Sequence, residues 1–260
     1  MREICQSHLP LKPWMAENTR RLPGLNPLVP GDWLWVDDVY RAQMARREEL
    51  LAEKRNQVYR MSPGAVPAAA ELLARILTEL DGRPGFSRKT GALGRPDGRR
   101  VRLDGPDPLI VAASLVQEDL VILEKRGDQH VLTGAVLCFP ASWSLDDKFD
   151  HDLTDIHAPV ARYTDDVGRR VQRVFDLIRP ENPMWRANHL IYSDPELFQP
   201  RRTSDRRSVD PDGPLWARVE RQCLLRLPKT GAVVFSIHTF VVPLSKLSEA
   251  ERAALLAADR

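Results

Sequence analysis

The sequence has few of the features that mark secreted, membrane or nucleic-acid-binding proteins. Its 260 residues include three cysteines, which are far apart and form no Cys-x-x-Cys pair, so a disulfide scaffold and a zinc cluster are both disfavoured. There is no run of eighteen apolar residues, and the opening MREICQSHLP lacks an apolar stretch, so we expect no membrane span and no signal peptide. The formal net charge of +2 provides no overall field to attract nucleic acid or an acidic membrane. We therefore expect a cytoplasmic protein.

Several catalytic motifs are also missing. The chain contains no Gly-x-Ser-x-Gly, no Walker loop, no Gly-x-Gly-x-x-Gly and no His-Glu-x-x-His. Glu118 and Asp119 are adjacent, so on a strand their side chains would point to opposite faces and could not work as a paired acid and base. These absences disfavour common hydrolase and phosphoryl-transfer sites, and we expect no NAD(P) or flavin site in this chain.

Hydrophobic periodicity predicts an α+β fold with one five-stranded antiparallel sheet and helices packed on it. The first two and the last two expected strands are joined by short turns, which makes them antiparallel hairpins. The expected strands are 120–125, 130–139, 185–193, 215–227 and 231–242. The expected helices are 38–59, 67–82, 108–117, 145–151, 163–177 and a terminal helix after residue 245.

The chain is expected to form one domain preceded by an arm. Residues 1–36 are rich in proline and carry three tryptophans, which predicts an extended segment pinned to the core by its aromatic side chains. Residues 37–260 are expected to form a single α+β domain. Within it, 82–106 is predicted to be a solvated Arg-rich connection, and 195–214 a polar excursion outside the core.

The stretch Phe139–Val160, FPASWSLDDKFDHDLTDIHAPV, holds the most informative histidine. Ser144 can cap a short helix that runs to about His151. Pro159 disfavours helical geometry in the residue before it, so the chain should reverse just after His157. A side chain at such a reversal can point into an interior cavity. On these grounds alone His157 is either a hydrogen-bonded structural residue or a ligand.

Strand alternation singles out Arg221, which interrupts an otherwise apolar face of its predicted strand. A buried, unpaired guanidinium is costly, so an anion should lie nearby. That anion is either an internal carboxylate, such as Glu118 or Asp119, or the carboxylate of a bound ligand. Arg186 is a second candidate by the same argument, and Arg218 is a weaker one because it lies on the more polar face of its strand.

His238 is the main rival to His157 as a metal ligand. Its predicted strand is apolar on both sides, so its ring should be buried. His151 lies six residues before His157, a spacing that matches no template for metal ligands.

Five stretches in a fixed order resemble the haem-dependent oxidative N-demethylase family. They are QEDL at 117–120, FPxxW with Lys148 and IHAPV within 139–160, WRAN at 185–188, ERQ at 220–222, and LP at 227–228 running into GAVVF at 231–235. The similarity extends from about residue 9 to about residue 244. The sequence departs from the family pattern at Ala161, His189, Cys223, His238 and Phe240.

This resemblance implies a PAS-like core that binds haem b, with His157 as the axial metal ligand. Arg221, Arg186 and Arg218 would lie near the haem propionates. The implied reaction is the O2-dependent removal of a methyl group from a small secondary amine such as dimethylamine, with release of formaldehyde. Electrons would come from a separate flavin and iron–sulfur reductase.

His238 and Glu118 are the candidates for catalytic residues that steer O2 at such a haem. Two alternatives stay open at this point: a PAS-like haem-binding sensor or interaction module without catalysis, and a relative that has kept the scaffold but lost haem.

Overall fold

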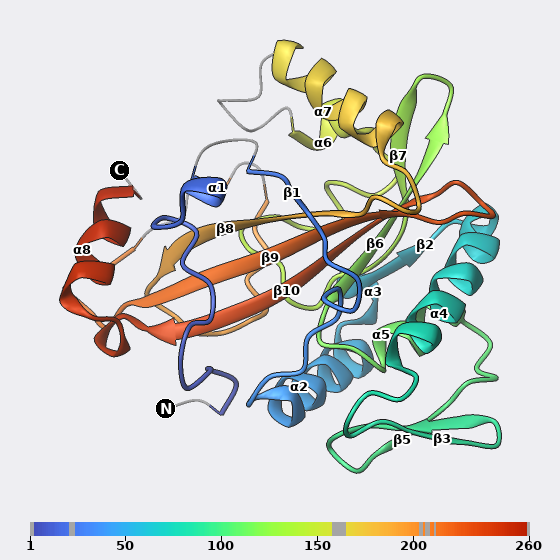
Figure 1. The fold of residues 1–260 in the computed structure, drawn as a ribbon, viewed down its shortest axis with the longest axis horizontal. Coiled ribbons are helices and arrows are strands. Elements are labelled where there is room, and N and C mark those ends of the chain that lie inside the picture. Colours follow the sequence, from blue (N-terminus) through green and yellow to red (C-terminus); the bar gives the residue numbers. More distant parts are fainter. Residues whose placement is uncertain are drawn as a thin grey trace.

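The protein is described by a computed structural model over residues 3–20, 24–157, 165–202, 205, 209–210 and 212–258, with the backbone alone at 157 and 165–167. It has an α+β fold, as predicted, built on an antiparallel sheet of seven strands (Figure 1). The strand order is β1-β8-β9-β10-β6-β7-β2. No helix in the described part of the chain is long and apolar enough to span a membrane.

The five predicted strands form the centre of this sheet, and their bounds agree closely with the sequence. They are β6 Asp119–Arg126, β7 Gln129–Val136, β8 Met184–Tyr192, β9 Trp216–Arg226 and β10 Val233–Pro243. The prediction of a five-stranded sheet was nevertheless wrong. Two short strands, β1 Asn26–Pro27 and β2 Tyr59–Met61, add to its edges. Strands of two or three residues carry no periodicity of their own, so only their pairing partners define them.

The long helices also follow the sequence pattern. They are α2 Tyr40–Glu53, α4 Val66–Leu80, α7 Asp165–Leu177 and α8 Glu249–Ala258. Shorter helices are α1 Glu17–Arg20, α3 Arg55–Val58, α5 Pro108–Ala113 and α6 Leu153–His157, with 3-10 turns at Pro63–Ala65 and Leu244–Lys246. The expected helix 38–59 is interrupted at Lys54 and becomes extended at Tyr59, where β2 pairs with β7.

Two segments differ from the sequence-based expectation. The connection 82–106 contains a second, three-stranded sheet made of β3 Ser87–Lys89, β4 Ala92–Gly94 and β5 Arg100–Arg102. The helix expected over 145–151 is a series of turns, although Ser144 does accept the predicted capping hydrogen bond from the Asp147 amide at 3.3 Å.

The edge of β7 explains why that helix does not form. The amide of Asp150 donates to the carbonyl of Leu132 at 2.9 Å, and the amide of Leu132 donates to the carbonyl of His151 at 3.0 Å. Asp150 adopts a φ of 62°, a left-handed conformation that ends any helix. Pairing with the strand edge therefore outweighs the local preference for a helix.

The central strands have two faces because side chains alternate along a strand. One face lies against α2, α4, α5 and the N-terminal segment, by which we mean residues 3–20 and 24–37, and we call it the arm face. Its core includes Leu72 and Ile76 of α4 packed with Leu120, Ile122 and Val234 of the sheet. On β9 and β10 this face also carries Val219, Arg221, Cys223, Ser236, His238 and Phe240.

The opposite face, which we call the α7 face, has a smaller apolar cluster. Phe175 of α7 and Leu153 of α6 pack there with Val121, Leu224 and Ile237. Farther along β8, β9 and β10 this face becomes polar. It carries Arg186, Asn188, Arg218, Glu220, Gln222 and Thr239.

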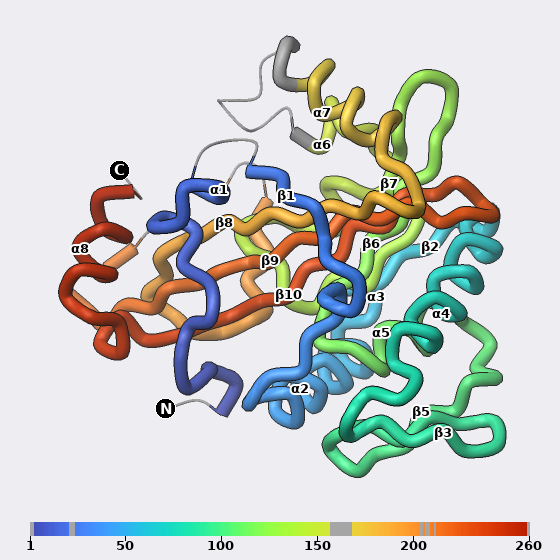
Figure 2. The backbone as a smooth tube through the Cα atoms, viewed as in Figure 1, coloured from blue at the N-terminus to red at the C-terminus, as the bar shows by residue number. Residues whose placement is uncertain are grey.

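The N-terminal segment crosses the sheet instead of extending into solvent (Figure 2). The amide of Gln6 donates to the Val241 carbonyl at 3.1 Å, and the Gln6 side-chain oxygen accepts from the Val241 amide at 2.7 Å. Farther on, the indole nitrogen of Trp33 donates to the Ser236 hydroxyl at 2.8 Å. Trp14 and Trp33 are both buried. Tryptophan side chains thus hold this segment on the arm face.

The polar excursion 195–214 contributes to the core, contrary to the prediction that it lies outside. Leu197 and Phe198 are buried and join the main apolar cluster. With Val209 they are the large apolar side chains of a mainly polar stretch, so the overall composition of the segment concealed them.

A buried ion pair joins α2 to the sheet. Arg47 Nη1 lies 2.9 Å from Asp119 Oδ1, and both side chains are fully buried. The Asp119 carboxylate also accepts from the amides of Cys138 and Phe139 at 2.9 and 2.7 Å. This one pair therefore fixes α2, β6 and the start of the 139–160 stretch relative to one another.

We predict that Arg47→Leu lowers the free energy of unfolding by about 3–5 kcal/mol, because Asp119 would keep its buried charge without a counter-ion. Urea denaturation measures the change. Arg46→Leu is the matched control. Arg46 pairs with Glu49 and Glu196 in partly solvated positions, so its loss should cost about 1 kcal/mol or less. Equal losses in the two variants would contradict the role of the buried pair.

Candidate functional site

The predicted site residues lie on both sides of the sheet. Arg221 and His238 are cross-strand neighbours on the arm face. Arg186 and Arg218 point to the α7 face, from β8 and β9. Because a sheet separates the two groups, they cannot line a single pocket, and each face has to be considered by itself.

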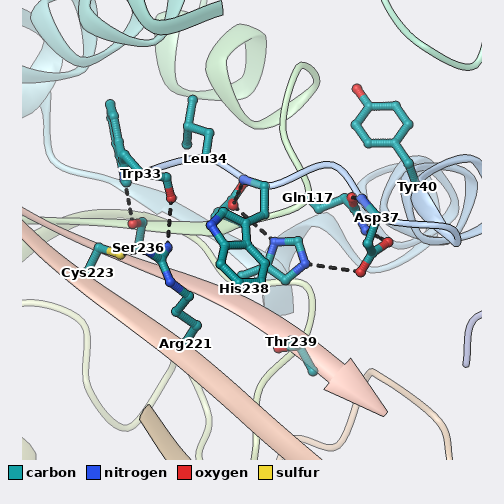
Figure 3. A network of polar contacts seen from close by, with 12 residues as sticks. Trp33, Leu34, Asp37, Tyr40, Gln117, Arg221, Cys223, Ser236, His238 and Thr239 are labelled. Atoms are coloured by element: carbon teal, nitrogen blue, oxygen red, sulfur yellow. Dashed lines mark hydrogen bonds and ion pairs between the residues drawn. The ribbon is translucent and has the colours of Figure 1, made fainter. Parts of the chain in front are cut away.

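On the arm face, Arg221 is buried and hydrogen-bonded within the chain (Figure 3). Its guanidinium donates to the Asp32 carboxylate at 2.9 Å, to the Asp32 carbonyl at 2.6 Å and to the Trp33 carbonyl at 3.0 Å. The group also lies over the rings of Trp35 and Trp185, at 4.8 and 5.4 Å from their centroids. The sequence correctly indicated that an anion is needed here. It is supplied by Asp32 of the N-terminal segment and not by Glu118 or Asp119.

His238 lies between two carboxylates, and its contact with Asp37 is seen in Figure 3. Its Nδ1 is 3.0 Å from Glu118 Oε1, and its Nε2 is 3.2 Å from Asp37 Oδ2. Burial alone would lower the pKa of His238. The charge and hydrogen bonds of Glu118 and Asp37 outweigh burial and raise this pKa to about 9. The ring is therefore an imidazolium at neutral pH, with both nitrogens donating.

Glutamine side chains extend this network to α2 and the N-terminal segment. Gln117 donates to Asp37 Oδ1 at 2.8 Å and to Gln43 Oε1 at 2.9 Å, and Gln6 donates to Asp37 Oδ2 at 2.8 Å. Glu118 also accepts from the Trp35 amide at 2.8 Å. The contacts that His238 and Glu118 make in this structure thus hold the arm on the sheet.

On the α7 face, Arg218 is buried and fastens two covering segments. It donates to the carbonyl of Phe139 at 2.6 Å and to that of Leu197 at 3.1 Å. Its guanidinium carbon lies 5.6 Å from the centroid of the Tyr192 ring. The stretch that begins at Phe139 and the excursion that contains Leu197 are therefore both anchored to β9 by one side chain.

Arg186 differs from the other arginines of the sheet. It is partly exposed, and its side chain makes no hydrogen bond to another described residue; its buried Nε, like that of Arg218, has no partner there. Burial lowers the pKa of Arg186, and the nearby charge of Glu220 opposes that shift. A half-buried guanidinium with unused donors is suited to bind a carboxylate that is not part of the chain.

Next to Arg186, three polar side chains form a row across β8, β9 and β10, which we call the acceptor row. Asn188 is directly opposite Glu220, and Glu220 is directly opposite Thr239. Asn188 Oδ1, Glu220 Oε1 and Thr239 Oγ1 are buried, and each lacks a hydrogen-bond partner in the described part of the structure. Burial raises the pKa of Glu220, and Arg218, Asn188 and Gln222 act in the opposite direction.

Sequence reasoning assigned no role to this row, although Asn188 and Glu220 stand in two of the quoted motifs. The indication was present in the alternation along β9, because Arg218, Glu220 and Gln222 share one face. Three polar residues in successive positions of one face, two of them charged, are unusual in a central strand that lies under covering segments.

Residues 24–259 match the family described as haem-dependent oxidative N-demethylase, alpha subunit-like. The chain belongs to this family. The match covers nearly the whole sequence, and it confirms the resemblance found in the five motifs. The family name describes a haem-dependent enzyme that removes N-linked methyl groups, and it describes a subunit of a larger assembly.

Four of the residues that depart from the pattern of the N-demethylase family lie on the arm face. Cys223 accepts a hydrogen bond from Arg221 at 3.2 Å. Phe240 stacks against His238 with 4.6 Å between ring centroids, and His189 meets the Trp14 ring at 5.4 Å. Ala161 lies outside the described residues. The described departures therefore concern the packing of the N-terminal segment, and the polar residues of the α7 face keep the quoted motifs.

The predicted axial ligand of this N-demethylase-like chain, His157, is the last residue of α6. Its side chain lies outside the described residues, so its role stays a prediction. The residue before it, Ile156, packs in the apolar cluster of the α7 face, and its carbonyl accepts a hydrogen bond from the Lys148 ammonium. The backbone of α6 thus places position 157 on the same side of the sheet as Arg186.

The described residues offer no cluster of metal ligands as an alternative to His157. No group of three or more His, Cys, Asp or Glu side chains there is arranged to hold a metal ion. A haem iron needs only one or two protein ligands, so a single histidine suffices for it.

We predict that His238 makes the stability of the protein fall at alkaline pH. Its pKa is raised from 6.5 to about 9, so the stabilisation is complete below 6.5 and is lost as the pH rises through about 9. The expected difference in unfolding free energy is about 3 kcal/mol. Urea denaturation of the wild type and of His238→Gln, between pH 6 and pH 10, isolates this contribution.

The exposed His151 provides the control, because His151→Gln should retain the pH dependence of the wild type. If His238→Gln loses stability with pH as steeply as the wild type, the two carboxylates do not hold an imidazolium.

Proposed function

We propose that this chain is the haem-binding subunit of an oxygen-dependent N-demethylase that acts on a small secondary amine. The net reaction converts the N-methyl amine, O2, two electrons and two protons into the demethylated amine, formaldehyde and water. The proposal rests on the family match over residues 24–259. Arg186, with its unused donor on the α7 face, is the structural observation that supports it most directly.

Haem fits the residues of the α7 face. A haem propionate would give the Arg186 guanidinium the carboxylate that it lacks within the described residues. His157 ends the helix that packs on this face, and it is our proposed axial ligand. Arg221 and Arg218 stay predicted propionate contacts. Their guanidiniums already donate to Asp32, and to the carbonyls of Phe139 and Leu197, which makes Arg186 the stronger candidate.

The haem would supply oxygen activation, and the chain would supply its position, its surroundings and access for the amine. Segments 139–145 and 197–199 contribute to these surroundings, because Arg218 holds both against the sheet. No part of the sequence resembles a site for NAD(P) or flavin, so we propose that electrons come from a separate flavin and iron–sulfur reductase.

His238 and Glu118 were predicted to steer O2. Both nitrogens of His238 and the Oε1 atom of Glu118 have partners on the arm face, where they hold Asp37 and Trp35 of the N-terminal segment. If the haem lies on the α7 face, the sheet separates these residues from it. We therefore propose that they support the fold and act on the reaction only through stability.

We predict that the chain reconstituted with haem shows a strong Soret band that is lost in His157→Ala. The reason is that the imidazole would be the only strong bond between the protein and the iron. Absorption spectroscopy during a haem titration measures both the band and the affinity. In Arg186→Gln the band should persist with roughly tenfold weaker haem binding, since one charge-assisted pair is lost.

Two histidine variants serve as controls. His151→Ala changes an exposed residue close to His157, and His238→Gln changes the buried ring on the other face. Both should keep the Soret band. Loss of the band in His238→Gln but not in His157→Ala would overturn the assignment of the axial ligand.

We also predict formaldehyde release when the reduced, haem-loaded protein receives O2 and dimethylamine. The amount should match the methylamine formed, as the balanced reaction requires. The His157→Ala protein is the control and should release none. A protein that binds haem but yields no formaldehyde with any of a panel of small N-methyl amines would point instead to a haem-binding sensor.

A further inference from the structure

The acceptor row is unusual because it combines burial with unused hydrogen-bonding capacity. Leaving a buried polar atom without a partner costs about 1–3 kcal/mol, so native proteins rarely keep three together. In the described structure Asn188 Oδ1, Glu220 Oε1 and Thr239 Oγ1 are all in this condition on adjacent strands. Cross-strand neighbours have Cβ atoms about 5 Å apart, so a single small group can reach more than one of them.

The pattern of existing hydrogen bonds defines what the row lacks. Asn188 and Gln222 both donate to Glu220 Oε2, at 3.2 and 2.9 Å. The other carboxylate oxygen and the Asn188 carbonyl oxygen are left as acceptors without a donor. The missing partner is therefore a donor of hydrogen bonds, and the carboxylate favours one with a positive charge.

The neighbouring arginines do not provide this donor. Arg218 directs its Nη atoms to the carbonyls of Phe139 and Leu197, and its buried Nε has no described partner, so it acts on Glu220 through charge and makes no described hydrogen bond to it. Arg186 makes no hydrogen bond to Glu220 among the described contacts and acts on it only through charge. If a propionate occupies Arg186, as in the proposed function, Arg218 remains as a cation beside Glu220, but Glu220 Oε1 still lacks a hydrogen-bond donor among the described residues.

The surroundings of the row suit a small cation with apolar groups. Ile237 and Val241 flank Thr239 on the same face of β10, and both are buried. The row is a poor site for a divalent metal ion, because it offers one carboxylate and the positive charges of Arg186 and Arg218 lie nearby. A dialkylammonium ion has two N–H donors for the two acceptors and two alkyl groups for the apolar neighbours.

We propose that the acceptor row of Asn188, Glu220 and Thr239 is the binding site for the cationic amine, with Glu220 pairing with the ammonium group. This inference rests on the proposed function, since it names the residues that would hold the substrate. Glu220 and its neighbours are positioning residues in this scheme. They hold the amine on the α7 face, where Arg186 would hold the haem.

Calorimetric titration of the full-length, haem-loaded chain with dimethylammonium chloride tests the proposal. Glu220→Gln keeps the size of the side chain and removes its charge, so binding should weaken at least tenfold while the Soret band is unchanged. Tetramethylammonium, which has no N–H group, should bind at least tenfold more weakly than dimethylammonium to the wild type. Glu124→Gln, on the partly exposed end of β6, is the matched control and should bind as the wild type does.

A second variant guards against a folding defect in Glu220→Gln. Thr239→Val removes a buried hydroxyl without a described partner and keeps the shape of the side chain. It should raise the melting temperature by about 2–4 °C, because a buried orphan group is lost, and it should weaken amine binding about fivefold. A hydroxyl with a purely structural role would change the melting temperature alone.

Three results would overturn the inference. They are a folded Glu220→Gln that binds dimethylammonium like the wild type, equal binding of sodium or potassium ions in competition, and a Thr239→Val that gains stability without losing affinity. The proposed function fails separately, because a wild-type chain without a Soret band contradicts haem binding whatever the amine titration gives.

Discussion

A buried cation in a sheet must be met by acceptors, and this requirement decides how the rest of the chain is arranged around β9 and β10. Arg221 and His238 on one face can be neutralised only by carboxylates brought to them. Asp32 and Asp37 of the N-terminal segment do so, and they draw that segment across the sheet. On the other face, Arg218 holds the carbonyls of Phe139 and Leu197. The covering segments are thus positioned by charge as much as by apolar contact.

This arrangement shows which parts of the structure the sequence could predict. The five central strands were found because each has enough residues for its alternation to be visible, and their hairpins imply antiparallel pairing. The edge strands at Asn26 and Tyr59 were missed because they exist only through their partners. The helix expected after Ser144 was wrong for a related reason. Its capping hydrogen bond at Ser144 forms, but the amide of Asp150 pairs with Leu132 at the edge of β7 and does not continue a helix.

The site residues also divide into those that one strand's alternation could identify and those that only the fold reveals. Alternation was sufficient to show that Arg221 needs an anion, since that requirement follows from its strand alone. It could not identify Asp32, because this contact spans 189 positions in the sequence and lies in a segment without periodicity. Nor could alternation show that the sheet separates His238 from Arg186, which requires the register of three strands. The residues of the acceptor row were visible in the sequence as motif letters, but their lack of partners is a property of the fold.

The two faces also differ in how far their polar groups are satisfied, and this contrast bears on function. On the arm face, the nitrogens of His238 and most donors of Arg221 have partners, although Glu118 Oε2 has no described one. The hydrogen bonds of this network offset much of the cost of burying its charges. On the α7 face, Arg186, Asn188, Glu220 and Thr239 keep buried atoms without described partners. Proteins tolerate such a cost where a ligand removes it. The described departures from the family pattern fall on the satisfied face, where a change of packing can be compensated locally. The unsatisfied face keeps its motif residues, as expected if the groups it must match, a carboxylate and an amine, belong to the reaction and not to the chain.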